Sequence, residues 1–359
     1  MRIGIVGLPN AGKSSLFNAL TGSAAQTANY PFTTIEPNVA VVPVADPRLD
    51  RVAEVVGASE VAPDTIEFYD VAGLVADAHR GEGLGNRFLG HIRETDAIAH
   101  VVRCHADERV VHPEGRVDPL ADVATVETEL VYADLEQVER RLERVARQAR
   151  GGVRQAANEE RWLEEVAEAL RAGRPARAAP AAPEAAAVRQ LALLSAKPVL
   201  FVANVDDGED EVPPQLAAHA DHVGAAAVAV CARLEAELAE LGAEEAAAMR
   251  EELGLPDAGV QRVVRAAFEL LDLIAFFTAD PGRPAMSRHM HRGMTAWDAA
   301  GMVHTDMQRG FVRAEVVTWH ELVEAGGFAG ARERGTLRVE GRDYPVADGE
   351  VVHVRFTPP

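Results

Sequence analysis

Eight residues near the start of the chain combine the glycines, the lysine and the hydroxyl that phosphate binding requires. They are GLPNAGKS, Gly7–Ser14, spaced as GxxxxGK followed by Ser or Thr. The glycines let backbone N–H groups surround a phosphate, and Lys13 would neutralise the β- and γ-phosphates. The Ser14 hydroxyl would bind Mg²⁺. The residues predicted to contact the nucleotide here are Asn10, Ala11, Gly12, Lys13, Ser14 and Ser15.

A second group of residues is expected to hold the metal ion and the γ-phosphate. Asp70 begins the sequence DVAG at the end of an apolar run, TIEFYDV. At the carboxyl end of a strand, Asp70 would hold Mg²⁺ through water, and the Gly73 N–H would reach the γ-phosphate. Thr33 or Thr34 could be the threonine of a switch loop that binds Mg²⁺. We therefore predict Ser14, Thr34 and Asp70 as metal ligands.

Two later segments are candidates for recognition of the base. Asn204-Val205-Asp206-Asp207 and Cys231-Ala232-Arg233 each follow an apolar run. In GTPase-like proteins the base binds at these strand ends. An ordinary turn would explain either match alone, but their order after the phosphate loop supports a common site. The predicted base-binding residues are Asn204, Val205, Asp207, Cys231 and Ala232.

These residues require a sheet whose strand ends meet at one edge. Short apolar runs predict buried parallel strands alternating with helices, beginning with a helix over Lys13–Leu20. The sequence therefore indicates an α/β protein built from βαβ units, with the Ras-like G domain of a P-loop NTPase. The predicted strands are Arg2–Val6, Thr65–Val71, Ala97–Arg103, Pro198–Asn204 and Ala226–Cys231.

The pattern changes between the third and fourth of these strands. Apolar residues from Val131 to Ala149 recur at alternating intervals of four and three, as in a coiled-coil seam. Gly151 and Gly152 interrupt the seam, and a second helical stretch follows. We interpret residues 126–190 as an inserted helical hairpin, although ordinary surface helices of the main domain would give a similar pattern.

The last part of the chain reads as a separate domain. From residue 276 to 357 short β-type segments alternate with glycine-rich turns, which predicts a small mixed α+β domain. The predicted organisation is thus a discontinuous G domain over residues 1–125 and 191–275, the inserted hairpin, and this C-terminal domain.

The charge distribution limits the partners of the chain. Its formal net charge of −20 argues against non-specific nucleic-acid binding, and we expect neither sequence-specific DNA nor a membrane as a partner. Two segments are nearly neutral: residues 127–190 carry eleven Arg against twelve acidic residues, and residues 276–356 carry ten against eleven. These segments could approach an RNA-rich partner. Lys13 and Lys197 are the only lysines.

The cysteine content and hydropathy predict a cytoplasmic protein. Cys104 and Cys231 are the only cysteines, which is too few for a disulfide framework or a cysteine zinc site. No apolar run is long enough for a membrane span. The start, MRIGIVGLPN, lacks the pattern of a signal peptide, so we expect no leader.

Long strings of the sequence resemble the YchF family, also called Obg-like ATPases. The resemblance covers nearly the whole chain and rests on the strings GLPNAGKSSLFNALT, NYPFTTIEPNVAVVPVADPRLD, DVAGLV, GEGLGNRFLGHIRETDAIAHVVRC, VANV, ARLEAELAEL and HTDMQRGFVRAEV. It implies that the insert is the family's helical A domain and that the C-terminal domain is its β-grasp TGS domain. It also implies ATP as substrate, Mg²⁺ as cofactor and the ribosome, at its large subunit, as partner.

The base-recognition segment departs from the family pattern. The family has Glu where this chain has Asp207, and a true GTPase would have Lys at the position of Val205. Asp207 is compatible with guanine, whereas Val205 removes one of the usual supports of that base. From the residues alone ATP and GTP both remain open, and the whole-chain resemblance favours ATP.

The residues expected to orient the attacking water are unusual. Leu74 follows DVAG, where Ras-like enzymes have Gln, and its side chain can form no hydrogen bond. By resemblance, His112 matches a family histidine implicated in catalysis; on spacing alone, a loop histidine bonded to backbone is the simpler interpretation. Asn10 occupies a position that binds K⁺ in some relatives, or it stabilises the turn. The predicted catalytic set is His112, Lys13 and the Leu74 position.

Three functions are consistent with these residues. The first is a slow ATPase that acts as a ribosome-associated switch in translation or stress regulation. The second is an Obg- or Drg-type GTPase, which Asp207 favours. The third is a binding module in which nucleotide occupancy alone changes a surface and hydrolysis is incidental, which Leu74 favours.

Overall fold

The computed structural model describes residues 1–27, 38–70, 84–106, 111–112, 115–151, 153–182, 191–255 and 258–358. They form two compact units, each built from two stretches of chain. The first is Met1–Val42 with Ile66–Ala267, and the second is Pro43–Thr65 with Phe268–Pro359. The predicted site residues Thr34, Gly73 and Leu74 lie outside the described ranges.

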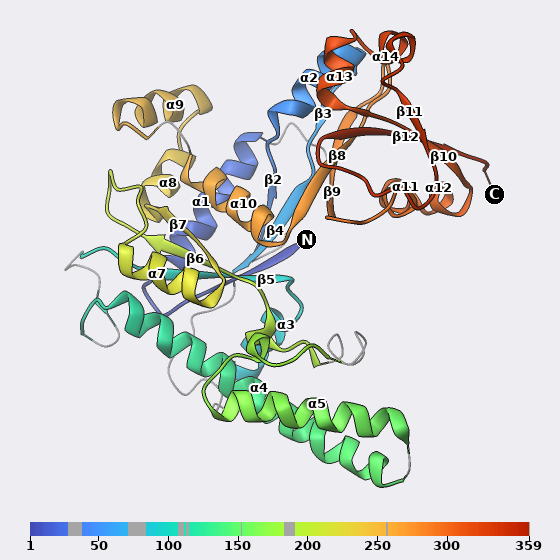
Figure 1. The fold of residues 1–359 in the computed structure, drawn as a ribbon. Coiled ribbons are helices and arrows are strands. Elements are labelled where there is room, and N and C mark those ends of the chain that lie inside the picture. The colour runs from blue at the N-terminus through green and yellow to red at the C-terminus, as the bar shows by residue number, and fades with distance from the viewer. Residues whose placement is uncertain are drawn as a thin grey trace. The chain divides into compact units, whose positions relative to one another are not determined.

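A six-stranded sheet of order β2-β4-β1-β5-β6-β7 forms the centre of the first unit (Figure 1). Strand β1 pairs in parallel with β4 and β5, and the β5–β6 and β6–β7 pairs are also parallel. Every residue of β5 and of β6 is buried, as their continuous apolar sequences predict. The strands are β1 (Arg2–Val6), β2 (Val39–Pro43), β4 (Thr65–Asp70), β5 (Ala97–Arg103), β6 (Val199–Asn204) and β7 (Ala226–Val230).

Helices pack around this sheet and extend from it (Figure 1). The first helix begins at Lys13, directly after the glycine-rich segment, as predicted. The helices of the first unit are α1 (Lys13–Thr27), α3 (Leu84–Arg93), α4 (Pro119–Arg150), α5 (Arg154–Arg171), α7 (Pro214–Val223), α8 (Ala232–Ala239), α9 (Ala243–Glu252) and α10 (Gly259–Leu270), with the 3-10 turns η2 (Ala176–Ala178) and η3 (Leu194–Ala196).

The predicted hairpin is formed by α4 and α5. Helix α4 begins at Pro119, before the predicted boundary at residue 126, because Asp118 caps it by accepting a hydrogen bond of 3.1 Å from the Ala121 N–H. The seam residues of α4 then pack against Trp162, Leu163 and other apolar residues of α5 in one continuous core.

One buried carboxylate anchors the hairpin where the chain returns from it. Asp134 of α4 has no exposed surface, and it accepts hydrogen bonds from the Leu194 N–H at 2.9 Å and the Ser195 N–H at 2.7 Å. The Ser195 hydroxyl donates to the same carboxylate at 2.7 Å. A buried carboxylate needs such partners to be tolerated, so η3 is fixed to α4 by this group.

The second unit contains a sheet of order β11-β10-β12-β8-β9-β3. The β10–β12, β10–β11 and β8–β9 pairs are antiparallel, and β12–β8 is parallel. The C-terminal mixed α+β fold is therefore as predicted. Its elements are α2 (Pro47–Val56), β3 (Val61–Ala62), β8 (Leu273–Thr278), β9 (Ala285–His291), α11 (Ala296–Val303), α12 (Thr305–Arg309), β10 (Phe311–Thr318), α13 (Trp319–Glu324), α14 (Phe328–Arg334), β11 (Arg338–Glu340) and β12 (Glu350–Phe356).

The predicted domain boundaries need a correction at residues 43–65. These residues were predicted to belong to the G domain, but in the structure they belong to the second unit. The apolar face of α2 packs into a core with Phe277 and Val351. Arg48 of α2 also forms an ion pair of 2.6 Å with Asp348. The predicted boundary at residue 276 is also corrected, because the second stretch of the second unit begins at Phe268.

None of the helices in the described ranges combines the length with the hydropathy that a bilayer-crossing segment requires.

The packing of the hairpin predicts a specific stability effect. Leu163 of α5 is fully buried in the hairpin core, so Leu163→Ala should lower the free energy of unfolding by about 2–5 kcal/mol. Urea denaturation followed by far-UV circular dichroism would measure this loss. The neighbouring Glu164 is exposed, and Glu164→Ala is the control, expected within about 0.5 kcal/mol of the parent. Equal effects of the two substitutions would contradict the described packing.

Candidate functional site

The phosphate loop joins β1 to α1 through two glycines that the structure requires. Gly7 has φ 151° and Gly12 has φ 102°, which L side chains rarely adopt. A Cβ on Gly7 would lie 2.4 Å from the carbonyl oxygen of Val101, and one on Gly12 would lie 2.2 Å from Nδ2 of Asn204. Both glycines are therefore fixed by close approach as well as by backbone conformation.

Lys13 is held across this loop. It is the first residue of α1, is only 7% exposed, and donates a hydrogen bond of 2.7 Å from Nζ to the carbonyl oxygen of Leu8. Burial lowers the pKa of its ammonium to about 8, while the carboxylate of Asp70 acts in the opposite direction. Asp70 therefore offsets only part of the cost of burying this positive charge. A bound polyphosphate would supply the further negative charge that stabilises the ammonium.

Ser14 and Asp70 have the chemistry of a magnesium site. Asp70 ends β4, which pairs with β1, and Ser14 is exposed at the start of α1. Burial raises the pKa of the Asp70 carboxyl, and Lys13 opposes that shift. A partly desolvated carboxylate and an exposed hydroxyl both offer the oxygen ligands that a hard cation prefers. These residues therefore fit Mg²⁺.

Asn204 connects the phosphate loop to the end of β7. Its Nδ2 donates to the carbonyl oxygen of Ala11 at 3.0 Å, and its Oδ1 accepts from the Ala232 N–H at 3.0 Å. The side chain is 5% exposed, so both bonds are shielded from water. Val205, which follows it, is 2% exposed. Asn204 therefore fixes the relative positions of β1, β6 and β7 at their carboxyl ends.

Asp207 is occupied by two neighbours from the next strand end. Its Oδ1 accepts a hydrogen bond of 2.9 Å from the thiol of Cys231, and its Oδ2 pairs with the guanidinium of Arg233. Burial, followed by the bond to Asp207, raises the pKa of the Cys231 thiol to about 11. The thiol therefore remains protonated and acts as a donor at neutral pH.

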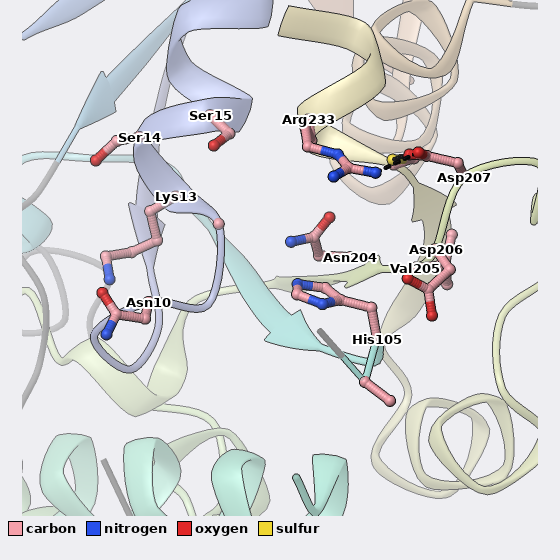
Figure 2. Close-up of a pocket in the computed structure, with 13 residues that line it drawn as sticks. Asn10, Lys13, Ser14, Ser15, His105, Asn204, Val205, Asp206, Asp207 and Arg233 are labelled. Carbon is pink, nitrogen blue, oxygen red and sulfur yellow. Dashed lines mark hydrogen bonds and ion pairs between the residues drawn. The ribbon is translucent and has the colours of Figure 1, made fainter. Parts of the chain in front are cut away.

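A cavity of about 610 Å³ connects the phosphate loop with this group. Figure 2 shows Asn10 and Lys13 on one side, Asp207 on the other, and Asn204, His105 and Arg233 between them, with Arg233 reaching toward Asp207. The volume lies in the range of small-molecule and cofactor sites. Its lining residues are Asn10, Gly12, Lys13, Ser14, Ser15, His105, Ala106, Asn204, Val205, Asp206, Asp207, Cys231 and Arg233.

His112 has a different environment from these lining residues. It is 8% exposed, and its Nε2 lies 3.0 Å from Oδ2 of Asp122 on α4. The amide of Asn10 donates a hydrogen bond of 3.0 Å to the carbonyl oxygen of Val111, the preceding residue. Asn10 therefore connects the phosphate loop to the segment that carries His112, while the His112 side chain is not among the residues that line the cavity.

The structure thus brings most of the predicted nucleotide residues together and adds others. His105 and Ala106 line the cavity but were not predicted, whereas Asp206 and Arg233 belong to the two candidate base-recognition segments without having been assigned a contact. His105 follows β5 by two residues, so the rule that places ligands at strand ends could have found it. Asp122 was also missed, because its contact with His112 depends on where α4 begins.

The other lysine of the chain has a structural role. Lys197 donates hydrogen bonds from Nζ to the carbonyl oxygens of Arg93, at 3.2 Å, and Thr95. It thereby satisfies carbonyl groups at the end of α3, where a cation is favourable. Of the two lysines in the sequence, Lys13 is therefore the one that lines the cavity.

A mainly parallel sheet, a strand–loop–helix phosphate cradle with an inward lysine, and a cavity at the strand ends define a P-loop nucleoside triphosphatase. Two protein families match the chain in sequence. Residues 2–142 match the family described as a 50S ribosome-binding GTPase, and residues 273–357 match the YchF GTPase C-terminal family, described as a protein of unknown function.

Full-length relatives identify the family. The protein named ribosome-binding ATPase YchF from Bacillus subtilis is 44% identical over 98% of both chains, and the protein of that name from Haemophilus influenzae is 45% identical over 99% of both. The YchF GTPase structure from Schizosaccharomyces pombe superimposes with a TM-score of 0.86 at 31% identity, covering 99% of this chain and 97% of that one. The chain belongs to the YchF family.

A more distant structure shares the fold. A GTP-binding protein from Pyrococcus horikoshii aligns with a TM-score of 0.64 at 22% identity, over 99% of this chain and all of that one.

The low pKa of Lys13 predicts how nucleotide affinity depends on pH. Bound phosphates would raise that pKa, so the affinity gained from the ammonium is fully present below about pH 8 and is lost as the pH rises from this value toward the raised pKa of the complex. Affinity should fall about tenfold between pH 7 and pH 9. Titration of a fluorescent nucleotide at each pH would measure this fall. Lys13→Arg, whose guanidinium stays charged, should bind with a flat profile; a parallel fall in that variant would contradict the assignment.

Proposed function

We propose that this protein is a magnesium-dependent ATPase that hydrolyses ATP to ADP and acts as a ribosome-associated switch in the cytoplasm. The observation that carries the proposal is the continuous cavity from Lys13 and Ser14 to Asn204 and Asp207, which offers a phosphate cradle at one end and base-binding groups at the other. Relatives at about 45% identity are named ATPases, which favours adenine over guanine.

The residues of the chain divide the work of hydrolysis. Lys13 would bind the β- and γ-phosphates, and the N–H groups after Gly12 would bind the β-phosphate at the start of α1. Ser14 and Asp70 would hold Mg²⁺, together with Thr34. Mg²⁺ held there would supply positive charge to stabilise the developing charge on the phosphates.

The attacking water would be oriented by His112, with Asp122 holding the imidazole. Their separation of 3.0 Å supports a pair in which the carboxylate fixes the ring. Leu74 follows DVAG in the sequence and can supply no hydrogen bond, so intrinsic turnover is expected to be slow. The Asn10 side chain is engaged with the Val111 carbonyl through its amide nitrogen, which leaves its oxygen as the ligand that K⁺ would use.

The ribosome is proposed as partner because the full-length relatives are named ribosome-binding. The large subunit is favoured by the family matched over residues 2–142, which is described as 50S ribosome-binding. The nearly neutral segments of the chain, residues 127–190 and 276–356, are the parts that an RNA-rich surface would repel least. They coincide with the α4–α5 hairpin and the second unit, which we propose to be a TGS domain. Control of translation or of the stress response would follow.

Two alternatives are each supported by one feature. Asp207 lies in the cavity, where a GTPase would bind guanine through a carboxylate. Leu74, in the position of a water-orienting Gln, favours a binding module in which occupancy of the site changes a surface and hydrolysis is incidental.

Measurement of base preference and turnover tests the proposal against both alternatives. ATP should bind more tightly than GTP in a side-by-side titration with Mg²⁺, and chelation of the metal should abolish hydrolysis. Single-turnover hydrolysis should accelerate on addition of ribosomes, and Lys13→Ala should show no hydrolysis. A clear preference for GTP would favour the GTPase, and unchanged slow hydrolysis with ribosomes would favour the binding module.

The role of His112 has its own test. His112→Ala should reduce the single-turnover rate of ATP hydrolysis by about 10²–10⁴-fold, with little change in ATP affinity, because the proposed role of the ring is to orient the water and not to bind the nucleotide. The melting temperature of the variant separates catalysis from structure. A lower melting temperature with an unchanged rate would show that the pair with Asp122 only anchors its segment to α4.

A further inference from the structure

Both oxygens of the Asp207 carboxylate already have partners within the chain. The Cys231 thiol donates to Oδ1 at 2.9 Å, and the Arg233 guanidinium pairs with Oδ2. Figure 2 shows the Arg233 side chain extended toward Asp207, with dashed lines at the Asp207 carboxylate. Cys231 is the N-cap residue of α8, and Arg233 lies in the first turn of that helix.

Guanine recognition requires those two oxygens. A carboxylate binds guanine by accepting from N1–H and from the N2 amino group together, so each oxygen must direct one lone pair at the base. The Cys231 thiol uses one lone pair of Oδ1 and leaves the other, whereas a guanidinium at the same edge competes with the guanine donors. Adenine has an N6 amino donor next to the N1 acceptor, and a free carboxylate facing N1 would be repelled by its lone pair. A guanidinium at the same edge can instead donate to N1.

We infer that Arg233 is a base-selecting residue, which occupies the guanine-binding edge of Asp207 and presents a donor to adenine instead. The inference rests on the proposed ATPase function and names the side chain that would set its base preference.

The placement of Arg233 supports this role. A cation in the first turn of a helix opposes the positive end of the helix dipole, so the position does not serve the stability of α8. Among the described residues that line the cavity, Lys13 and Arg233 are the only lysine and arginine side chains, and Figure 2 shows Arg233 directed away from Lys13, toward Asp207. Val205, where a GTPase would carry lysine, is buried and apolar. Arg233 is therefore the permanent cation at the base end.

The exposure of the pair limits the size of the effect. The Arg233 and Asp207 side chains are 53% and 51% exposed, and exposed ion pairs contribute little because solvent screens them. The pair would bias the choice of base without excluding guanine. A change in relative affinity of about three- to fivefold is therefore expected when Arg233 is removed.

The experiment compares the affinities of ATP and GTP in matched variants of the full chain. Competition against a fluorescent nucleotide with Mg²⁺ gives both dissociation constants. Arg233→Gln should tighten GTP binding about three- to fivefold and leave ATP binding equal or weaker. The double variant Arg233→Gln with Asp207→Asn should lose the gain, because the amide cannot accept from both guanine donors.

A second arginine provides the control. Arg171 of α5 forms an ion pair of 2.7 Å with Glu139, and its side chain is 55% exposed. Arg171→Gln removes the same kind of interaction away from the cavity and should change neither constant. Melting temperatures establish that the variants fold.

The outcomes separate this inference from the function on which it rests. A parent protein that prefers GTP would contradict the proposed ATPase, while the change of ratio in Arg233→Gln would still test Arg233. An unchanged ratio in Arg233→Gln, or a gain for GTP that persists in the double variant, would overturn the inference.

Discussion

The contact between Gly12 and Asn204 determines how the rest of the site is assembled. The Asn204 amide lies where a side chain at residue 12 would be, and it donates to Ala11 while accepting from Ala232. Three strand ends are thereby locked together by one buried side chain. Because buried polar groups are costly when unpaired, this arrangement has little freedom to change. The phosphate cradle and the base end of the cavity are consequently parts of one rigid framework.

Electrostatics at the two ends of this framework are organised differently. Lys13 is a buried cation whose charge is only partly compensated within the chain, so its energy improves when an anion binds. Arg233 is an exposed cation already paired with Asp207. In the proposed function, the first arrangement would favour tight binding of any polyphosphate, and the second would favour discrimination between bases. Affinity and selectivity would then depend on separate residues.

The sequence predicted the fold of the first unit because local signals and tertiary structure agree there. The continuous apolar runs of β5 and β6 can be satisfied only in the interior of a sheet, and the seam of α4 requires a partner such as α5. Residues 43–65 were misassigned because the partners of α2, such as Phe277, lie far along the chain. The engagement of Asp207 by Cys231 and Arg233 could not be predicted either, since residue types and spacing do not report which side chains a carboxylate has already paired with.

The second unit is built from two stretches of chain that are far apart in the sequence, so its two parts are synthesised at different times. Helix α2 emerges early in synthesis, but the strands that cover its apolar face follow roughly 200 residues later. At about 5–20 residues per second, that face waits on the order of 10–40 s for its partners. Residues 268–359 produced alone would lack α2, so an isolated C-terminal fragment would have an open core.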